Sequence, residues 1–346
     1  MNYLVYRNDG LGDLIVSTPL LSNIKNFDHN AKICLVCSKR NYKFANFLLK
    51  DGLIDEIFIS VDKGKSFIDF ISLWMKSLKF KPDYSFVLKS STTNYLASIF
   101  SKKHKILGIV PINEKNLRIR ETPNKILQSV LFKKEIIDCR NNYEKSKNIR
   151  MVDHYRNLFL KGFDYPSDKY YKKLFKPKLE ISDYINNFKT NKLISNKNIL
   201  IHLDEKWSRY PISNFQIHEL IKKIECSSYD KIIITCGKIL TKHNLYLFKQ
   251  FNVNINNEDA EEKNNIIFFK KLNLKSLAEL IILSDTIITS EGGVSHLSSV
   301  FEKKLINLIQ KEKQDFLGKW KPQIDDYHHV VLESDKVVNQ ITECLS

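Results

Sequence analysis

Short apolar runs rich in Ile and Val alternate with amphipathic stretches long enough for helices, and this alternation restarts in the second half of the chain. Strands that are apolar along their whole length are typical of parallel sheets that helices cover on both faces. In the first half we expect strands at 3–6, 33–37, 56–60, 84–88 and 105–109, and helices at 14–26, 41–49, 67–78 and 93–101. In the second half we expect strands at 198–202, 231–235, 266–269, 286–289, 305–309 and 329–332, and helices at 213–224, 242–251, 274–283 and 294–301. The predicted fold class is therefore α/β, with two doubly wound domains.

The length of 346 residues also fits two domains. Residues 135–195 are charged, rich in Asn and Lys, and carry little strand signal. We expect a first domain over 1–180, a linker region over 181–196, a second domain over 197–333 and a C-terminal helix over 334–346. Two such domains imply a cleft between the carboxyl ends of two sheets, where α/β folds bind ligands.

The formal net charge of +16 suggests a polyanionic partner, such as a nucleic acid, an anionic membrane face or a phosphorylated substrate. The alternative is a solvated lysine surface, because Lys and Asn are abundant everywhere. No apolar run reaches 18 residues, and Met1 leads directly into a short strand. We therefore expect a cytoplasmic chain with neither a signal peptide nor a membrane span.

Six cysteines are present, and only Cys34 and Cys37 lie close together in the sequence. On a strand, positions i and i+3 point to opposite faces, so this pair is not expected to bind one metal ion. Structural thiols in a reducing compartment are the expected explanation. The sequence also contains no Asp-x-Asp pair that would hold Mg²⁺ on a diphosphate, so we expect no metal.

The first strand-to-helix turn reads RNDGLGDL, residues 7–14. Ile15 stands where a dinucleotide fingerprint needs its third glycine, and there is no phosphate-loop lysine motif. Asp13 is expected at the first helical position. A carboxylate there can cap the helix, or it can accept a proton from a substrate hydroxyl.

A second turn leads from an expected strand into a helix through Glu291, Gly292 and Gly293. Paired glycines before a helix expose its first N–H groups and make an anion site suited to a phosphate. His296, about one turn into that helix, is either structural or adds a hydrogen bond to the same anion.

The stretches GLGDLIVSTPLL and LKSLAELIILSDTIITSEGGVSHLSSVFEKKLINLI resemble glycosyltransferase family 9, the heptosyltransferases of lipopolysaccharide core assembly. Weaker matches are ILIHLDEKWSRYPISNF, MVDHYRNLFLKGF and GKWKP, so the resemblance covers most of the chain in order. It implies the GT-B architecture, two Rossmann-like domains facing each other across a cleft. The implied reaction is inverting, metal-independent transfer of a heptose from ADP-heptose to a lipopolysaccharide core acceptor.

The resemblance also assigns residues. Asp13 is implied to be the general base, with Gly12 in the same acceptor-side turn. The residues implied to bind the nucleotide-sugar are Glu291, Gly292, Gly293, His296 and, against the base, Leu272. The family's Asp-Thr-Gly is Glu291-Gly292-Gly293 here, and its lysine position falls on Ser208, so Lys206 or Arg209 is expected to face the leaving diphosphate.

The core acceptor implied by the resemblance is anionic and lies at the inner membrane, so the net positive charge of the chain would attract it. Peripheral contact with that membrane is expected. Arg118 and Arg120, in the basic stretch 115–125, are candidate acceptor contacts or part of a solvated loop. Three alternatives stay open. They are a related enzyme that moves another sugar to a different surface glycan, a paralogue that binds without turnover, and a basic nucleic-acid-binding protein, although no nucleic-acid motif is present.

Overall fold

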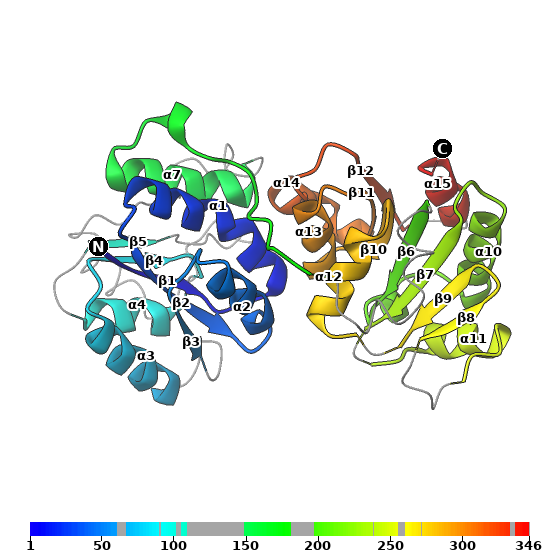
Figure 1. Ribbon diagram of the computed structural model, residues 1–346, viewed down its shortest axis with the longest axis horizontal. Coiled ribbons are helices and arrows are strands. Elements are labelled where there is room, and N and C mark those ends of the chain that lie inside the picture. The colour runs from blue at the N-terminus through cyan, green and yellow to red at the C-terminus, as the bar shows by residue number, and fades with distance from the viewer. Residues whose placement is uncertain are drawn as a thin grey trace. The chain divides into compact units, whose positions relative to one another are not determined.

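The computed structural model describes residues 1–60, 67–89, 91–101, 105–108, 149–180, 197–237, 239–254, 260–270, 272–332 and 336–345. The chain forms two compact units (Figure 1). Unit 1 comprises Met1–Lys178 with Gly318–Lys321, and unit 2 comprises Leu179–Leu317 with Pro322–Ser346. The expected linker region 181–196 lies outside the described residues.

Unit 1 is a five-stranded parallel sheet with helices on both faces. Its strand order, β3-β2-β1-β4-β5, reverses direction between β1 and β4. Figure 1 shows α1 and α7 on one face, and α3 and α4 on the other. The elements are β1 (Asn2–Arg7), α1 (Leu11–Phe27), β2 (Lys32–Ser38), α2 (Tyr42–Lys50), β3 (Glu56–Ser60), α3 (Phe67–Phe80), β4 (Tyr84–Val87), α4 (Thr92–Ile99), β5 (Lys105–Gly108), α7 (Met151–Phe163) and the 3-10 helix η2 (Ser167–Lys169).

Helix α7 was not predicted, because its stretch is highly charged and follows a long polar segment. It packs on α1 through an aromatic cluster. The ring of Phe163 lies 4.8 Å from the rings of Phe27 and Tyr84 and 4.9 Å from that of Phe159, measured between centroids. Aromatic pairs at these separations are stabilising. This packing fixes α7 against the sheet and brings Tyr155 to the carboxyl end of β1.

Unit 2 is a seven-stranded sheet of order β12-β11-β10-β6-β7-β9-β8, in which only β8 runs antiparallel. Its direction of winding reverses between β6 and β10. The elements are β6 (Asn198–Leu203), η3 (Trp207–Arg209), α10 (Asn214–Glu225), β7 (Lys231–Cys236), α11 (Lys242–Gln250), β8 (Glu261–Lys263), β9 (Ile266–Phe269), α12 (Leu274–Ile282), β10 (Thr286–Ser290), α13 (Gly293–Val300), β11 (Lys304–Ile309), η4 (Lys311–Lys313), α14 (Gln314–Trp320), β12 (Tyr327–Val331) and α15 (Val337–Glu343).

The continuous burial of the inner strands explains why their apolar runs could be recognised in the sequence. Strand β6 is buried at every position, and so is β10. In doubly wound sheets the crevice at the reversal of strand order, outside the carboxyl ends, is where ligands bind. The reversals at β1/β4 and β6/β10 therefore identify one candidate site in each unit.

Cys34 and Cys37 lie buried on β2 as free thiols. Burial raises the pKa of both groups, that of Cys37 to about 12, so neither is a ready thiolate. In the described part of the chain no group of three or more His, Cys, Asp or Glu side chains is arranged to hold a metal ion, and no helix is long and apolar enough to cross a membrane.

Candidate active site

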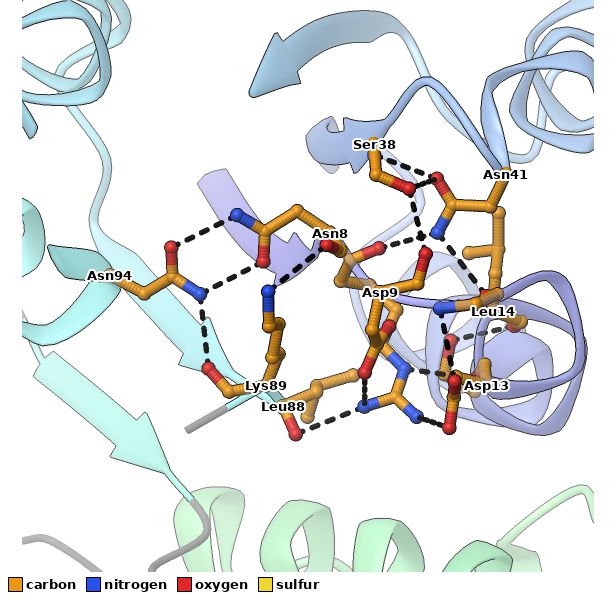
Figure 2. Close-up of polar contacts among 12 residues, drawn as sticks. Asn8, Asp9, Asp13, Leu14, Ser38, Asn41, Leu88, Lys89 and Asn94 are labelled. Atoms are coloured by element: carbon orange, nitrogen blue, oxygen red, sulfur yellow. Dashed lines mark hydrogen bonds and ion pairs between the residues drawn. The ribbon is translucent and has the colours of Figure 1, made fainter. Parts of the chain in front are cut away.

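The turn between β1 and α1 is held on both sides by buried amides and hydroxyls (Figure 2). Asn8 and Asn94 exchange side-chain hydrogen bonds of 3.2 and 3.0 Å. On the other side, the side chain of Asn41 donates to the carbonyl of Arg7 at 2.7 Å, and the hydroxyl of Ser38 donates to the carbonyl of Asp9 at 2.7 Å. Because these partners are buried, the backbone path of residues 7–9 is tightly defined.

Arg7, the last residue of β1, organises this turn. Its side chain is 2% exposed. Nη1 donates to the carbonyl of Leu88 at 3.0 Å, and Nε donates to the carbonyl of Asp13 at 2.9 Å. The guanidinium also pairs with the carboxylates of Asp9 and Asp13, at 3.2 and 3.1 Å, and lies over the ring of Tyr155 at 5.3 Å. A buried arginine needs such partners, and here it joins the ends of β1, β4 and α1.

Asp13 is the third residue of α1, and the expectation of a first helical position was wrong. The helix begins at Leu11, three residues before the expected start. The reason is local: Asp13 Oδ2 accepts the N–H of Gly10 at 3.0 Å, so the acid caps the turn from inside the helix. Asp13 Oδ1 accepts from Arg7 Nη2, and the side chain remains 28% exposed.

Asp9 was not singled out in the sequence, although it shares Arg7 with Asp13. Burial raises its pKa to about 6; the nearby Asp13 charge acts in the same direction, while Arg7 and Lys89 oppose the shift. Its Oδ1 is buried and accepts no hydrogen bond from a described residue. A carboxyl group that titrates near neutral pH beside an ordered acid is typical of functional sites.

The acceptor-side residues expected from the sequence are only partly described. Gly12 is buried inside α1, as its second residue. Arg118 and Arg120 lie outside the described residues.

The corresponding turn of unit 2 follows β10, and Glu291 is at its centre. The carboxylate accepts from the Tyr210 hydroxyl at 2.7 Å and pairs closely with the ammonium of Lys313. Lys206 lies 3.9 Å from the same carboxylate and donates to the carbonyl of Glu291. Burial, followed by the bond to Glu291, raises the pKa of Tyr210, so this side chain acts as a hydrogen-bond donor.

Gly292 adopts φ 145°, a backbone conformation that only glycine adopts without strain. A Cβ at this position would also meet Nζ of Lys206. The threonine that the family carries here is therefore incompatible with this backbone. Gly293 begins α13, and His296 lies buried one turn further along that helix.

The remaining donor candidates come from two separate segments and differ in exposure. Ser208 and Arg209 are exposed residues of η3, and the hydroxyl of Ser208 donates to the carbonyl of Glu205 at 2.7 Å. Leu272 is half-buried in the loop before α12. The structure thus brings Lys206 directly to Glu291, whereas within the described part of the chain neither Ser208 nor Leu272 makes a hydrogen bond or ion pair with that cluster.

Residues 133–342, more than half of the chain, match the model of glycosyltransferase family 9 (heptosyltransferase). This chain belongs to glycosyltransferase family 9. It is therefore a glycosyltransferase of the heptosyltransferase family, as the sequence motifs indicated. No curated protein matches the sequence.

Solved structures of family 9 proteins share the fold, at low sequence identity. ADP-heptose lps heptosyltransferase II from E. coli is 16% identical with a TM-score of 0.64, over 100% of this chain and 97% of that chain. E. coli heptosyltransferase WaaC, determined with ADP, is 13% identical with a TM-score of 0.65, and the match covers 100% of this chain and 99% of that chain. A family 9 glycosyltransferase from Veillonella parvula is 13% identical with a TM-score of 0.66, and the match covers 96% of this chain and 86% of that chain. The GT-B fold class expected from the sequence is confirmed.

Family membership does not by itself reveal the partners of the motif residues. Arg7 and Asp9 precede the GLGD motif and could have been found as charged residues at the end of a buried strand. Lys313 lies 22 residues after Glu291 in the sequence, and no local pattern links the two. Only the parallel pairing of β10 with β11 brings η4 next to the Glu291 turn.

The contact between Gly10 and Asp13 predicts a specific coupling. A Cβ on Gly10 would lie 2.7 Å from Asp13 Oδ2, so Gly10→Ala must displace the carboxylate from the N–H that it caps. We expect a loss of about 1–2 kcal/mol in the free energy of unfolding, measured in urea. In an Asp13→Ala background the clash is absent and the loss should be clearly smaller. Equal losses in the two backgrounds would contradict this account.

Proposed function

We propose that this family 9 enzyme transfers a heptose from ADP-heptose to a lipopolysaccharide core acceptor, with inversion at the anomeric carbon and without a metal ion. The observation that carries the proposal is the Asp13 carboxylate, fixed by Gly10 and Arg7 at the β1/β4 reversal. This crevice is the position at which doubly wound sheets bind ligands.

In the proposed reaction Asp13 is the general base. The acceptor hydroxyl loses its proton to this carboxylate as its oxygen forms a bond to the anomeric carbon. The bond from that carbon to the phosphate oxygen breaks, and its electron pair leaves with the nucleoside diphosphate. Attack on the face opposite the leaving group inverts the configuration.

Unit 2 supplies the groups that we propose bind the donor. Lys206 and Lys313 bring two ammonium groups to the Glu291 turn, where Gly292 and Gly293 open the N-terminus of α13. Cations and free backbone N–H groups stabilise the charge of a departing diphosphate. Arg209, exposed on η3, is a further cation for this role, and His296 and Leu272 complete the proposed donor site.

The proposal of a metal-free reaction rests on these cations and on the sequence. No Asp-x-Asp pair is present to hold Mg²⁺ on the diphosphate, and the ammonium groups can carry the charge instead. Turnover is therefore expected to continue in excess EDTA. A metal-free reaction would be contradicted if EDTA abolished turnover and added Mg²⁺ restored it.

The donor is identified by thermal protection of the full chain, because only a bound ligand stabilises the fold. We expect ADP-heptose to raise Tm more than UDP-, GDP- or dTDP-sugars do at equal concentration. Lys206→Met should reduce the affinity for ADP-heptose about tenfold, through loss of one charge-assisted contact. The matched control is Lys242→Met, which removes an exposed lysine of α11.

If another nucleotide-sugar protects the chain more strongly, the result favours the alternative in which the enzyme transfers a different sugar to a different surface glycan. The change of the family's Asp-Thr-Gly to Glu291-Gly292-Gly293 favours this alternative. Protection without turnover on any acceptor would favour a paralogue that only binds. Tighter, salt-dependent binding to a random DNA duplex than to any nucleotide-sugar would favour the nucleic-acid alternative.

Asp13→Asn tests the proposed base directly. We expect transfer to fall by a factor on the order of 10³, because the amide cannot take the proton, while donor affinity stays within about twofold. Turnover is measured with ADP-heptose and a heptose-free core acceptor, and affinity by calorimetry with ADP. Near-normal turnover in this variant would exclude Asp13 as the base.

We also propose peripheral contact with an anionic membrane through α3. Ile68, Ile71 and Met75 lie on one side of this helix and are 73%, 39% and 58% exposed. Lys79 follows on the same helix and is exposed as well. An apolar stripe beside lysine suits the surface of a bilayer with anionic headgroups.

Sedimentation with vesicles of phosphatidylglycerol and phosphatidylcholine measures this contact. The double variant Ile68→Asp, Met75→Asp should bind about tenfold more weakly or worse, because two apolar side chains no longer enter the bilayer. Phe215→Asp is the matched control, since Phe215 is 68% exposed on α10 of unit 2. Equal loss in the control, or no loss in the double variant, would argue against α3 as the membrane contact.

A further inference from the structure

The carboxylate of Asp9 has no role in the reaction proposed above, although it lies on the same arginine as the proposed base. Arg7 Nη1 is 3.2 Å from Asp9 Oδ2, and Arg7 Nη2 is 3.1 Å from Asp13 Oδ1. Asp9 Oδ1 is buried without a hydrogen bond from any described residue. Burying a carboxylate oxygen without a donor is unfavourable, so the position of Asp9 needs an explanation other than stability.

Charged and titratable groups face Asp9 from several elements. Arg7 comes from β1, Asp13 from α1, Lys89 from the segment after β4, and Tyr155 from α7. Lys89 Nζ donates to the carbonyl of Asn8 at 3.2 Å, so its charge is held beside the turn. Burial raises the pKa of Asp9 to about 6, with Asp13 adding to the rise and the two cations opposing it. Asp9 is therefore ionised above this pH and neutral below it.

The charge of Asp9 changes what Arg7 does to Asp13. A guanidinium paired with a single carboxylate favours the ionised form of that carboxylate and weakens it as a base. When Asp9 is ionised, the two carboxylates share the one positive charge. When Asp9 is neutral, the full charge acts on Asp13.

We propose that Asp9 is a positioning residue that shares the charge of Arg7 and thereby keeps Asp13 basic enough to take the proton of the acceptor hydroxyl. The inference rests on the proposed function, because it assigns Asp9 a role in the step that Asp13 performs. It predicts that the acid side of the pH–rate profile belongs to Asp9.

Asp9→Asn imitates the neutral form of Asp9 and so provides the test. With ADP-heptose and a heptose-free core acceptor, kcat/KM for the acceptor should rise in the wild-type enzyme around pH 6. The variant should lack this rise, with a rate about tenfold below wild type at about pH 8 and equal to it at about pH 5. A variant rate reduced by the same factor at both pH values would mean that Asp9 acts only structurally and would overturn the proposal.

Two further variants separate charge from packing. Asp9→Glu retains the carboxylate and should restore a rise with pH. Asp69→Asn replaces a buried acid of unit 1 that does not contact Arg7 and accepts from the Ser60 hydroxyl at 2.7 Å, and it should keep the rise near pH 6. Loss of the rise in Asp69→Asn, or its absence in Asp9→Glu, would contradict the role given to Asp9.

A titration that needs no substrate distinguishes failure of this inference from failure of the proposed function. In protein labelled with ¹³C at the aspartate carboxyls, the resonance missing from Asp9→Asn should titrate near pH 6. Its midpoint should fall in Asp13→Asn, because the Asp13 charge that raises it is gone. A midpoint at the ordinary value for aspartate, or one that Asp13→Asn leaves unchanged, would overturn the inference even if ADP-heptose proves to be the donor. If the titration behaves as expected and no sugar is transferred, the proposed donor or acceptor is wrong instead.

Discussion

The buried guanidinium of Arg7 is the interaction on which the first site depends. It binds the backbone after β4 through Leu88, the backbone and carboxylate of α1 through Asp13, and the turn itself through Asp9. A guanidinium 2% exposed is stable only when its donors are satisfied, so the sheet, the helix and the turn must assemble around it together. Two acids are therefore held at the reversal of strand order by one cation.

Unit 2 has a similar reversal of strand order, but the charges at its turn are opposite in sign to those of unit 1. Here one carboxylate, Glu291, gathers the ammonium groups of Lys206 and Lys313 at the reversal between β6 and β10. These side chains are more exposed than Arg7, at 19%, 36% and 44%, so the pairs are weak and can open for a stronger anion. In the reaction proposed above, the first site holds the proton acceptor, Asp13, on a turn fixed by Arg7 and Gly10. The second site holds two cations that, in the proposed reaction, exchange Glu291 for a phosphate group of the donor.

The sequence predicted the fold well because the inner strands of both sheets are parallel and buried, so that each appears in the sequence as a continuous apolar run. Its errors have physical causes. The start of α1 was placed three residues late because glycines at 10 and 12 suggest a turn, whereas Gly10 is the N-cap, Asp13 accepts its N–H, and the helix already includes Gly12. Helix α7 was missed because its aromatic residues are dispersed among charges. They form a cluster only when Phe163 packs against Phe27 and Tyr84 from other elements. Sequence motifs predicted Asp13, Lys206 and Glu291 as candidates, whereas Asp9 and Lys313 become candidates only through contacts between separate elements.

The two acids on Arg7 differ in how many of their carboxylate oxygens have a partner. Both oxygens of Asp13 are engaged, one by the Gly10 N–H and one by Arg7, which fixes the direction of the carboxylate. Asp9 has one oxygen on the arginine and one without a partner among the described residues. A base that is oriented by a cation needs a second negative charge nearby to stay reactive, and that charge must not compete for the substrate. A half-buried acid on the other terminal nitrogen of the same guanidinium meets both conditions, and Asp9 occupies this place.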